Sequence, residues 1–559
     1  MKNHQIVVLA VVVCLACVAS APAQDAHVLR SPQVSKPIFG ITPPLRDLIK
    51  SQPHELQLGF HQVNPLHYPK LQQLLWNTRH YNYAATRDPL AQNQAQPATI
   101  PTLEASWLGV GIGFYGYSVP DAPTDANLSI GDTQIVQWVN VQFAVFDLNG
   151  NSILFNGQHY VDGNILWQSG PCSQTNSGDI IAQWDKMAHR WVMYQPRFTA
   201  PYYDCFAISQ TNDATGAYYT YQFPTYNNST DFPDYPKVGV WPNGYYVSHN
   251  DFPNLQSYAG AMPCAYDRVK MLAGDQSAQG VCFLDNSNGT LFDDSMLPAD
   301  VDDANAPPNG IDPIYVGSID NGQNGVDSNV YYYHFHFDPV TPTNSTFDCT
   351  NGACRIPVAQ YTVQFGTAPE PGGDVIETVG DRLMYRLAYR ILPAPTPQRT
   401  VRDNRKQDWL VSHTVINNGA TAVRWYEFRA PIDNTTPTVY QQGTYAPDST
   451  YRFMSSLARD SAGNIAMSYT VTSTSVYPTI AYTGRAGGDP LGTMGPESIL
   501  VPGTGSQTDT SNRWGEYYNM SLSNDGCTFV TTGEYYQSTA SFHWSTEIGK
   551  LKFDNCTPH

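Results

Sequence analysis

Arginine is the most unevenly distributed charged residue in the chain. Of 20 arginines, 12 lie between Arg382 and Arg513, whereas the whole sequence holds 10 lysines. A guanidinium group binds carboxylates and other planar polar groups through a fork of N–H donors, so a cluster of arginines suits an acidic sugar or sulfate. The candidates for orienting such a substrate are Arg386, Arg452, Tyr482, Arg485 and Arg513. The alternative is that each arginine ties neighbouring sheets together through a local carboxylate.

Glutamate stands beside tyrosine twice near the C-terminus, at Glu516-Tyr517 and Glu534-Tyr535. Glycosidases need two opposed carboxyl groups, one of them with a raised pKa, so Glu516 and Glu534 are the candidate catalytic residues. The chemistry would be that of a glycoside hydrolase or a polysaccharide lyase. A sialidase is disfavoured, because the stretch Ser523–Phe529 is one residue short of the aspartate-box turn of those enzymes.

An acidic stretch at residues 285–327 holds nine aspartates and neither lysine nor arginine. Carboxylate oxygens in a loop rich in Gly and Asn suit Ca²⁺, which commonly rigidifies exported β proteins. The candidate ligands for a structural calcium ion are Asp293, Asp294, Asp300, Asp302 and Asp303. A solvated acidic loop without metal is the alternative, because the EF-hand spacing is absent.

Turn signals recur along the last 430 or so residues and must position these side chains. An Asp or Asn followed closely by Gly, as in Asp147–Gly150, Asp213–Gly216, Asp460–Gly463 and Asn524–Gly526, closes β-hairpins because these residues tolerate positive φ. Strand-like stretches lie on both sides, and no segment of a dozen residues shows helical periodicity. The pattern predicts an all-β chain, a β-propeller with seven blades most favoured and six or eight as alternatives. The tail Ile548–Phe553 would then pair with an N-terminal strand and remove an exposed edge.

The N-terminal residues suggest export. Residues 1–23 resemble a signal peptide, with Lys2, an apolar stretch from Ile6 to Val13 and the small-x-small pattern Ala21–Ala23. A lipoprotein signal centred on Cys17 is the alternative. Residues 24–104 read as an N-terminal extension and linker, and residues 105–559 as the propeller domain. A chain of this kind is expected outside the cell or in the periplasm, as a monomer without a transmembrane segment.

Eight cysteines remain after the signal peptide, an even number that indicates disulfides in an exported protein. Proximity in sequence favours the four pairs Cys172–Cys205, Cys264–Cys282, Cys349–Cys354 and Cys527–Cys556. The formal net charge of −18 argues against nucleic acid and anionic lipid as partners, because both require a basic face. An extracellular glycan or a protein ligand is expected instead.

Several long phrases resemble a family of large secreted bacterial β-propeller-like proteins. They are DRLMYRLAYR from Asp381 to Arg390, IAYTGRAGGDPLGTM from Ile480 to Met494, and RWGEYYNMSLSNDGCTF from Arg513 to Phe529. The resemblance covers about residues 105–556 and implies a secreted propeller-like domain, without an activity or catalytic residues. Aspartate is usual in that family at the position of Glu516, which puts a metal or acid role there in doubt.

Together these patterns predict a secreted propeller that binds, and in the catalytic case hydrolyses, an extracellular polysaccharide at its axial face. The competing interpretation is a non-enzymatic surface or interaction scaffold, in which the repeated residues serve only the fold.

Overall fold

The computed structural model describes residues 28–51 and 87–558, apart from 154–156, 254, 256–257, 286–293, 304, 319–325, 350–353, 364–365, 381, 394–403 and 435. The proposed signal peptide therefore lies outside the described residues. The described chain is all-β, as the sequence predicts. Its strands form sheets of eleven, five, five, four, four and four strands and one two-stranded hairpin. Seven sets of four antiparallel strands can be traced within these sheets, two of them joined by a parallel pair in the eleven-stranded sheet, and we number these sets sheets 1 to 7. No helix among the described residues is long and apolar enough to cross a membrane.

The first three sheets follow one another directly along the chain. Sheet 1 contains β6 (Asn127–Ile130), β7 (Gln134–Val139), β8 (Gln142–Asp147) and β9 (Val161–Asp162). Sheet 2 contains β10 (Ile181–Asp185), β11 (Arg190–Arg197), β12 (Tyr203–Ser209) and β13 (Tyr218–Pro224). Sheet 3 contains β14 (Asp231–Trp241), β15 (Gly244–Pro253), β16 (Gly260–Asp267) and β17 (Gly280–Cys282), with the short helices α3 (Tyr226–Ser229) and α4 (Arg268–Ala273) beside it.

The next three sheets repeat the pattern. Sheet 4 contains β18 (Leu297–Val301), β19 (Ile314–Gly317), β20 (Val326–His336) and β21 (Thr346–Asp348), and β22 (Arg355–Thr362) also pairs with β20. Sheet 5 contains β25 (Leu383–Leu392), β26 (Lys406–Asn417), β27 (Ala420–Pro431) and β28 (Thr438–Tyr445). Sheet 6 contains β29 (Tyr451–Arg459), β30 (Ile465–Ser473), β31 (Val476–Arg485) and β32 (Ser498–Val501). A separate hairpin, β23 (Thr367–Pro369) and β24 (Val375–Glu377), lies between sheets 4 and 5 in sequence.

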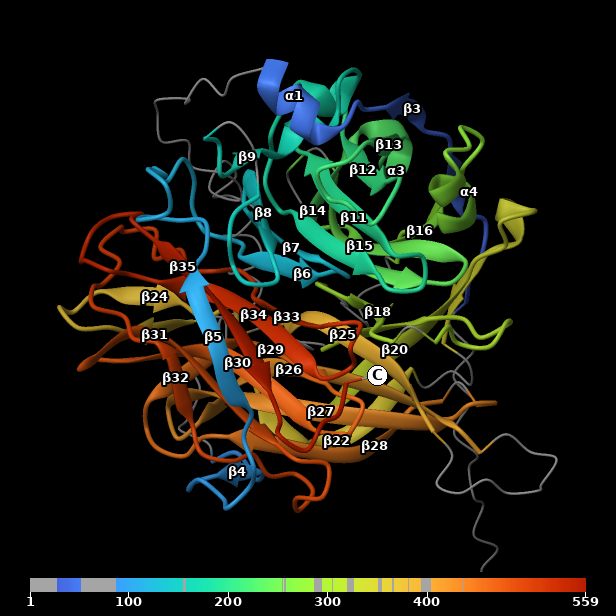
Figure 1. Ribbon diagram of the computed structural model, residues 1–559. Helices are drawn as coiled ribbons and strands as arrows, with labels where there is room; N and C mark the ends of the chain where they lie inside the picture. The colour runs from blue at the N-terminus through green and yellow to red at the C-terminus, as the bar shows by residue number, and fades with distance from the viewer. Residues whose placement is uncertain are drawn as a thin grey trace, which may run out of the picture.

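Sheet 7 joins the two ends of the chain. Its strands are β33 (Asn519–Leu522), β34 (Thr528–Tyr535), β35 (Ser545–Lys552) and β5 (Thr102–Leu108). The C-terminal tail pairs with an N-terminal strand, as expected, and Figure 1 shows β5 in blue beside the red β35. The domain boundary drawn from sequence between residues 104 and 105 falls inside β5, because the edge of β35 needs this strand for pairing.

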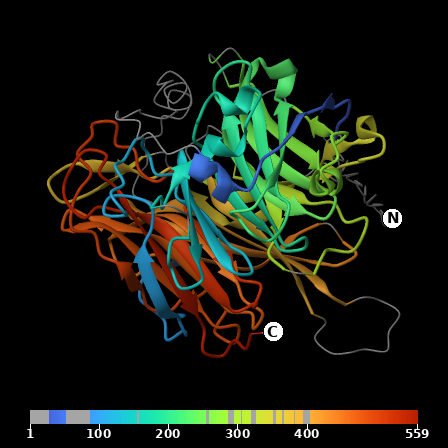
Figure 2. The same ribbon diagram turned by 45° about the horizontal axis from the view of Figure 1, so that its top comes forward.

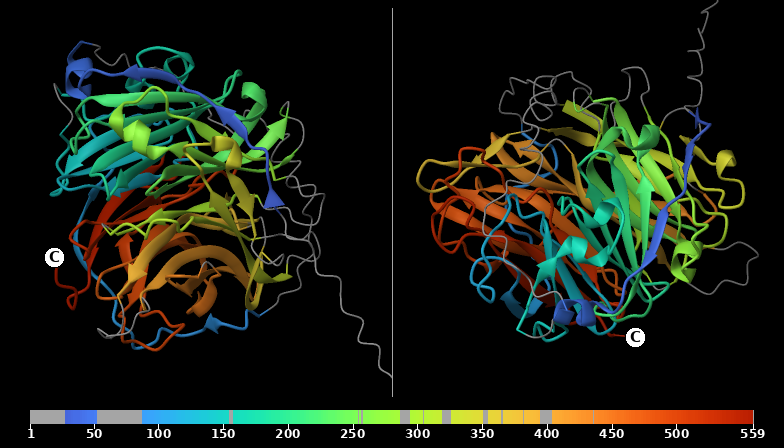
Figure 3. Two further views of the ribbon diagram at one scale, coloured as in Figure 1. Left: turned by 90° about the vertical axis from the view of Figure 1, so that its right-hand side faces the viewer. Right: turned by 90° about the horizontal axis from the view of Figure 1, so that it is seen from above.

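The N-terminal extension runs along outer edges of the sheets. β1 (Val28–Leu29) pairs with β21, β2 (Gln33–Ser35) with β17, and β3 (Ile38–Ile41) with β13. After α1 (Leu45–Ser51), β4 (Ala91–Gln92) pairs with β28. Figures 2 and 3 show the first of these segments in blue crossing the green and yellow sheets. The described part of residues 24–104 is thus not a free linker: it covers strand edges that would otherwise be open.

Asp88 fastens this extension to sheet 5. Its carboxylate accepts hydrogen bonds from Arg424 at 2.6 and 2.7 Å and from Thr444 at 3.0 Å, and both Asp88 and Arg424 are buried. Both contacts come from the Arg424 Nη2, and this buried, charge-assisted pair fixes one arrangement of the two segments.

The first strands of the seven sheets lie next to one another in succession. Each contacts the first strand of the following sheet, and β33 of sheet 7 contacts β6 of sheet 1. β18 and β25 even pair directly, as parallel strands. The arrangement is β-propeller-like, and residues distant in sequence therefore meet where the first strands converge.

A network of ion pairs and hydrogen bonds lies where the first strands converge. We call it the axial ion network, and it comprises Gln183, Lys186, Asp300, Asp302 and Arg386. Arg386 lies 2.6 Å from Asp300 and 2.5 Å from Asp302, and Lys186 lies 2.6 Å from Asp302. Gln183 donates to Asp300 at 2.6 Å, and the Arg386 Nε donates to the Met520 carbonyl at 3.2 Å. Side chains from sheets 2, 4 and 5 and a carbonyl from sheet 7 thus share one buried centre.

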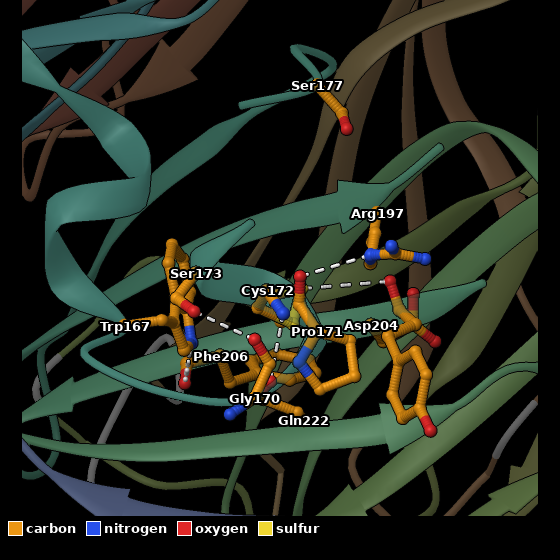
Figure 4. Close-up of a disulfide and its surroundings, with 12 residues drawn as sticks. Trp167, Gly170, Pro171, Cys172, Ser173, Ser177, Arg197, Asp204, Phe206 and Gln222 are labelled. Atoms are coloured by element: carbon orange, nitrogen blue, oxygen red, sulfur yellow. Dashed lines mark hydrogen bonds between the residues drawn. A yellow bond between two sulfur atoms is a disulfide. The ribbon is translucent and has the colours of Figure 1, made fainter. Parts of the chain in front are cut away.

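All four cysteine pairs predicted from the sequence are present as disulfides. Cys172–Cys205 joins a 3₁₀ turn, η2 (Pro171–Ser173), to β12, and Figure 4 shows Arg197 donating to the Pro171 carbonyl beside it. Cys527–Cys556 ties the segment after β35 to the start of β34. Disulfides of this kind persist in oxidising compartments.

The turns predicted from Asp, Asn and Gly are present, but they do not occupy one position in each sheet. Asn418 and Gly419 form the two-residue turn between β26 and β27, both with positive φ. Asp460–Gly463 joins β29 to β30, whereas Asp213–Gly216 joins β12 to β13. This difference explains why the spacing of the turn signals along the sequence is irregular.

Candidate functional site

A strained backbone position recurs at the beginning of every sheet. In each case a residue other than glycine takes a left-handed conformation with φ between +45° and +68°, just before the first strand or at a bulge within it. The seven residues are Asp125, Asp179, Tyr235, Ser295, Val379, Met454 and Glu516. Such conformations are costly for residues with a side chain, and they concentrate at functional sites.

Charged side chains gather around five of these positions. We call this group the axial acid–base cluster, and it comprises Asp125, Asp179, Asp234, Lys237, Arg382, Arg513 and Glu516. These residues come from sheets 1, 2, 3, 5 and 7, and each carboxyl group lies close enough to others in the cluster to influence their ionisation. Asp234 is half-buried, whereas Asp179, Arg382 and Glu516 are buried but retain 6–7% of their surface exposed. The cluster therefore meets solvent mainly through Asp234.

Arg513 holds Glu516 in place. Its Nη2 donates to the Glu516 carboxylate in a close contact, and its Nε lies 3.6 Å from the carboxylate of Glu377 at the end of β24. The Glu516 main chain is fixed as well, because its carbonyl accepts from the Tyr235 hydroxyl at 3.2 Å.

Lys237 is a buried ammonium group held by aromatic rings. Its Nζ lies 3.4 Å from the centroid of the Tyr235 ring and 4.0 Å from that of Tyr517, and it donates one hydrogen bond to the Pro236 carbonyl at 2.9 Å. Among the described residues no carboxylate forms an ion pair with it. Burial lowers the pKa of Lys237 to about 8, although Asp179 and Asp125 act in the opposite direction. Two of its three N–H donors are therefore left for other partners.

Asp125 is a buried carboxyl group in the same cluster. It is fully buried, and neither of its carboxyl oxygens has a hydrogen-bond partner within the described part of the chain. Burial, reinforced by the charges of Asp179 and Glu516, raises the pKa of Asp125 well above its usual value. An unpartnered buried carboxyl group is costly, which marks this position as one prepared for a ligand.

The remaining two carboxyl groups of the cluster have intermediate acidity. Burial and the charge of Asp234 raise the pKa of Asp179 to about 7, and burial and the charge of Glu516 raise the pKa of Asp234 to about 6. A protonated and an ionised carboxyl group can therefore coexist near neutral pH, which is the requirement of general acid–base catalysis.

Glu534, on β34, lies behind the cluster and clasps two of its strained segments. One carboxyl oxygen accepts from the Thr124 hydroxyl at 2.7 Å and from the Gly515 N–H at 2.9 Å. Thr124 and Gly515 directly precede Asp125 and Glu516, and the Asp125 N–H also donates to the Gly515 carbonyl at 3.0 Å. Glu534 is thus placed to position the cluster from behind, with 1% of its surface exposed.

We expect Glu534→Gln to alter how stability depends on pH. Burial raises the pKa of Glu534 from 4.5 to about 8, with Thr124 and Gly515 opposing and Glu370 adding to the shift. The protonated form thus contributes stability that is complete below pH 4.5 and is lost as pH rises towards 8. Denaturant unfolding at both ends of this range should show the variant gaining stability over the wild type as pH increases. A difference that stays constant would mean that Glu534 does not titrate in this range.

The structure separates the residues singled out from the sequence. Glu516 and Arg513 lie in the axial acid–base cluster, and Glu534 lies directly behind it. Arg386 lies in the axial ion network, bound to two carboxylates. The other three lie in sheet 6, where Arg452 pairs with Asp448 and Glu497, Arg485 donates to the Asp489 carbonyl, and Tyr482 packs in the core.

The candidate calcium ligands are also separated. Asp300 and Asp302 are bound by Arg386 and Lys186, so cationic side chains already occupy their carboxylates. Asp303 lies 3.6 Å from Arg390, Asp294 is buried, and Asp293 lies outside the described residues. A calcium ion at these residues stays a prediction from the sequence.

Sequence reasoning missed Asp125, Asp179, Asp234, Lys237 and Arg382. All five lie within three residues of a left-handed position, and the types at the seven positions range from Asp to Val and Met. No shared residue type marks the strained backbone, so the signal exists only in three dimensions. DYPKVGVW, which contains Asp234 and Lys237, reads simply as a strand.

The chain matches no protein-family model, and no curated protein matches it. Among solved structures, the endo-arabinase from Bacteroides thetaiotaomicron VPI-5482 is similar over 59% of this chain and 95% of its own, at 13% identity and a TM-score of 0.26. The WD40 domain of SCAP from fission yeast is similar over 76% of this chain and 82% of its own, at 8% identity and a TM-score of 0.32. An α-L-arabinofuranosidase from Podospora anserina is similar over 58% of this chain and 93% of its own, at 10% identity and a TM-score of 0.25. Structural similarities this weak support no conclusion about the family or function of this chain.

Proposed function

We propose that the seven sheets are the blades of a seven-bladed β-propeller. Three observations support this: the succession of first strands returns from β33 to β6, the axial ion network joins four sheets, and β5 completes the last sheet beside β35. The axial acid–base cluster then lies at the end of the axis where the first strands begin.

We infer that this cluster binds an extracellular glycan and hydrolyses it. The observation that carries the proposal is that Lys237 and Asp125 are both fully buried within the same cluster. The two residues influence each other's ionisation, but they form no direct ion pair, and both keep hydrogen-bonding capacity while buried. A sugar hydroxyl would match this pair chemically, because it can accept from an ammonium group and donate to a carboxylate at the same time.

The carboxyl groups of the cluster would provide the catalytic groups for hydrolysis. In its protonated form Asp179 would donate a proton to the glycosidic oxygen as the bond to the anomeric carbon breaks. The Glu516 side chain, held by Arg513, would act on the opposite side, either on a water molecule or on the anomeric carbon. Asp125 and Lys237 would orient the sugar hydroxyls without taking part in proton transfer to the leaving group. Tyr235 and Tyr517 add aromatic surface of the kind that sugars contact.

One observation favours a second reaction at the same site. The lowered pKa of Lys237, about 8, suits a base that removes a proton from a uronic acid. Elimination would then replace hydrolysis and leave an unsaturated sugar. In both cases the protein would act outside the cell or in the periplasm, where its four disulfides persist.

The test is a panel of neutral, uronic and sialic polysaccharides incubated with the full protein. New reducing ends without ultraviolet absorbance would support hydrolysis, and absorbance of an unsaturated uronate would support elimination. Lys237→Met should abolish binding in calorimetry, whereas Lys550→Met, a partly exposed lysine beside Glu104, should not. Binding that survives Lys237→Met, or no binding to any glycan, would contradict the proposal. Binding by the wild type without cleavage would support the scaffold interpretation.

A further inference from the structure

A second unpartnered carboxyl group lies at the end of the hairpin formed by β14 and β15. This end extends past the bulge between Asp234 and Lys237. Asp231 pairs with Pro253, and Asp251 pairs with Pro233, so both aspartates project from the same face as diagonal neighbours across the two strands. Backbones at such positions are about 7–8 Å apart, a separation that two carboxylates can span to reach one ion.

Asp251 forms the inner side of this pair. It is fully buried, and neither oxygen has a hydrogen-bond partner among the described residues. Among all the residues that the structure describes, only Asp125 and Asp251 have both carboxyl oxygens buried and without a hydrogen-bond partner. A buried carboxyl group without donors is expensive unless an ion or a proton compensates it.

Asp231 forms the outer side, next to an unusual turn. Its Oδ1 accepts from the Asn227 amide at 3.2 Å and from the Thr230 hydroxyl at 3.0 Å, while Asn227 and Thr230 are themselves exposed. Asn227, Asn228 and Ser229 are three consecutive left-handed residues, which bring this turn against the end of the hairpin. The half-buried Tyr226 is close enough to both aspartates to sense their charge.

We propose that Asp231 and Asp251 bind a divalent cation, and that the cation is calcium. The available ligands are oxygens: the two carboxylates, with the Tyr226 hydroxyl group near both of them. Oxygen ligands of flexible geometry select Ca²⁺, whereas zinc and copper require nitrogen or sulfur. The ion would compensate the buried charge of Asp251 and fix the turn at residues 226–229 to the end of the hairpin.

The site is independent of the glycan proposal and of the acidic stretch at residues 285–327. It does, however, adjoin the strained positions. Asn250, next to Asp251, accepts from the Ser295 N–H at 2.7 Å and donates to the Ser295 hydroxyl at 3.2 Å. Ser295 is the left-handed residue that precedes sheet 4.

The experiment uses the full protein freed of metal with a chelator. Calcium chloride should raise the melting temperature, a chelator should reverse the rise, and calorimetry should detect one bound ion. Asp251→Asn should abolish both effects while leaving the metal-free melting temperature unchanged or higher, because the variant no longer buries a carboxyl group. Magnesium chloride at equal concentration should have a smaller effect, because Mg²⁺ gives up its water molecules reluctantly.

Asp303→Asn and Asp125→Asn are the matched controls, one in the acidic stretch and one at the other unpartnered carboxyl group. Both should retain the calcium response. A response lost in Asp303→Asn but retained in Asp251→Asn would place the ion in the acidic stretch and overturn the inference. The absence of any response in the wild type would show that Asp251 is simply protonated, and would overturn it too.

Discussion

Arg386→Met is expected to lower the free energy of unfolding by about 3–5 kcal/mol, the usual cost of removing one partner from a buried ion pair. The guanidinium group lies within 2.6 Å of Asp300 and Asp302, and all three side chains are buried. Its removal leaves two carboxylates with Lys186 as their remaining cation. Urea denaturation followed by tryptophan fluorescence at neutral pH measures the change.

Arg485→Met is the matched control for this prediction. Arg485 is buried to the same extent, with 2% of its surface exposed, but it donates to a main-chain carbonyl instead of a carboxylate. We expect a smaller loss of about 1.5–3 kcal/mol, typical of a hydrogen bond that involves a charged group. If Arg386→Met unfolded like the wild type and lost glycan binding instead, Arg386 would be a substrate residue, as its sequence context suggests.

Asp179→Asn should reduce glycan hydrolysis by a factor of about 10²–10⁴, the usual contribution of a general acid. The amide keeps the shape of the side chain but has no proton to give to the leaving oxygen. In the wild type, activity should fall as pH rises through about 7, where burial and Asp234 place the pKa of Asp179. The measurements are kcat/KM and its pH profile on whichever glycan the panel identifies.

Two variants sharpen the interpretation of this result. Glu516→Gln should cause a loss of similar size without removing the alkaline decline, because Asp179 is unchanged. Asp303→Asn, outside the cluster, should leave kcat/KM unaltered. If Asp179→Asn kept both full activity and the alkaline decline, the general acid would have to be a different carboxyl group.

Local patterns in the sequence were sufficient for much of the architecture. Asn418-Gly419 predicts a hairpin turn because those residues accept positive φ, and the turn is present. The closing role of the tail could be anticipated because an exposed last strand needs a partner. The cysteine pairs followed from proximity, since the partners are separated by 5 to 33 residues.

The candidate site was much less predictable, because its partners are distant in sequence. Arg386 and Arg513 look alike as residues in expected strands. The first binds Asp300, 86 residues away, and becomes part of the interior, whereas the second binds Glu516, three residues away, at the cluster. Lys237 and Asp125 become neighbours only because the first strands of their sheets converge, and no local sequence pattern predicts this.

The pairing of β5 with β35 has a consequence for how the chain matures. The outer strand of sheet 7, β5, is synthesised early, but it can join the sheet only after β35 has been made near the C-terminus. During synthesis, Thr102–Leu108 therefore remains without its partner strand until most of the chain has been made, and the Cys527–Cys556 bond can form once the sheet is complete. A chain cut short before Ser545 would leave both β34 and β5 with open edges, ready to join another molecule instead of their own partner.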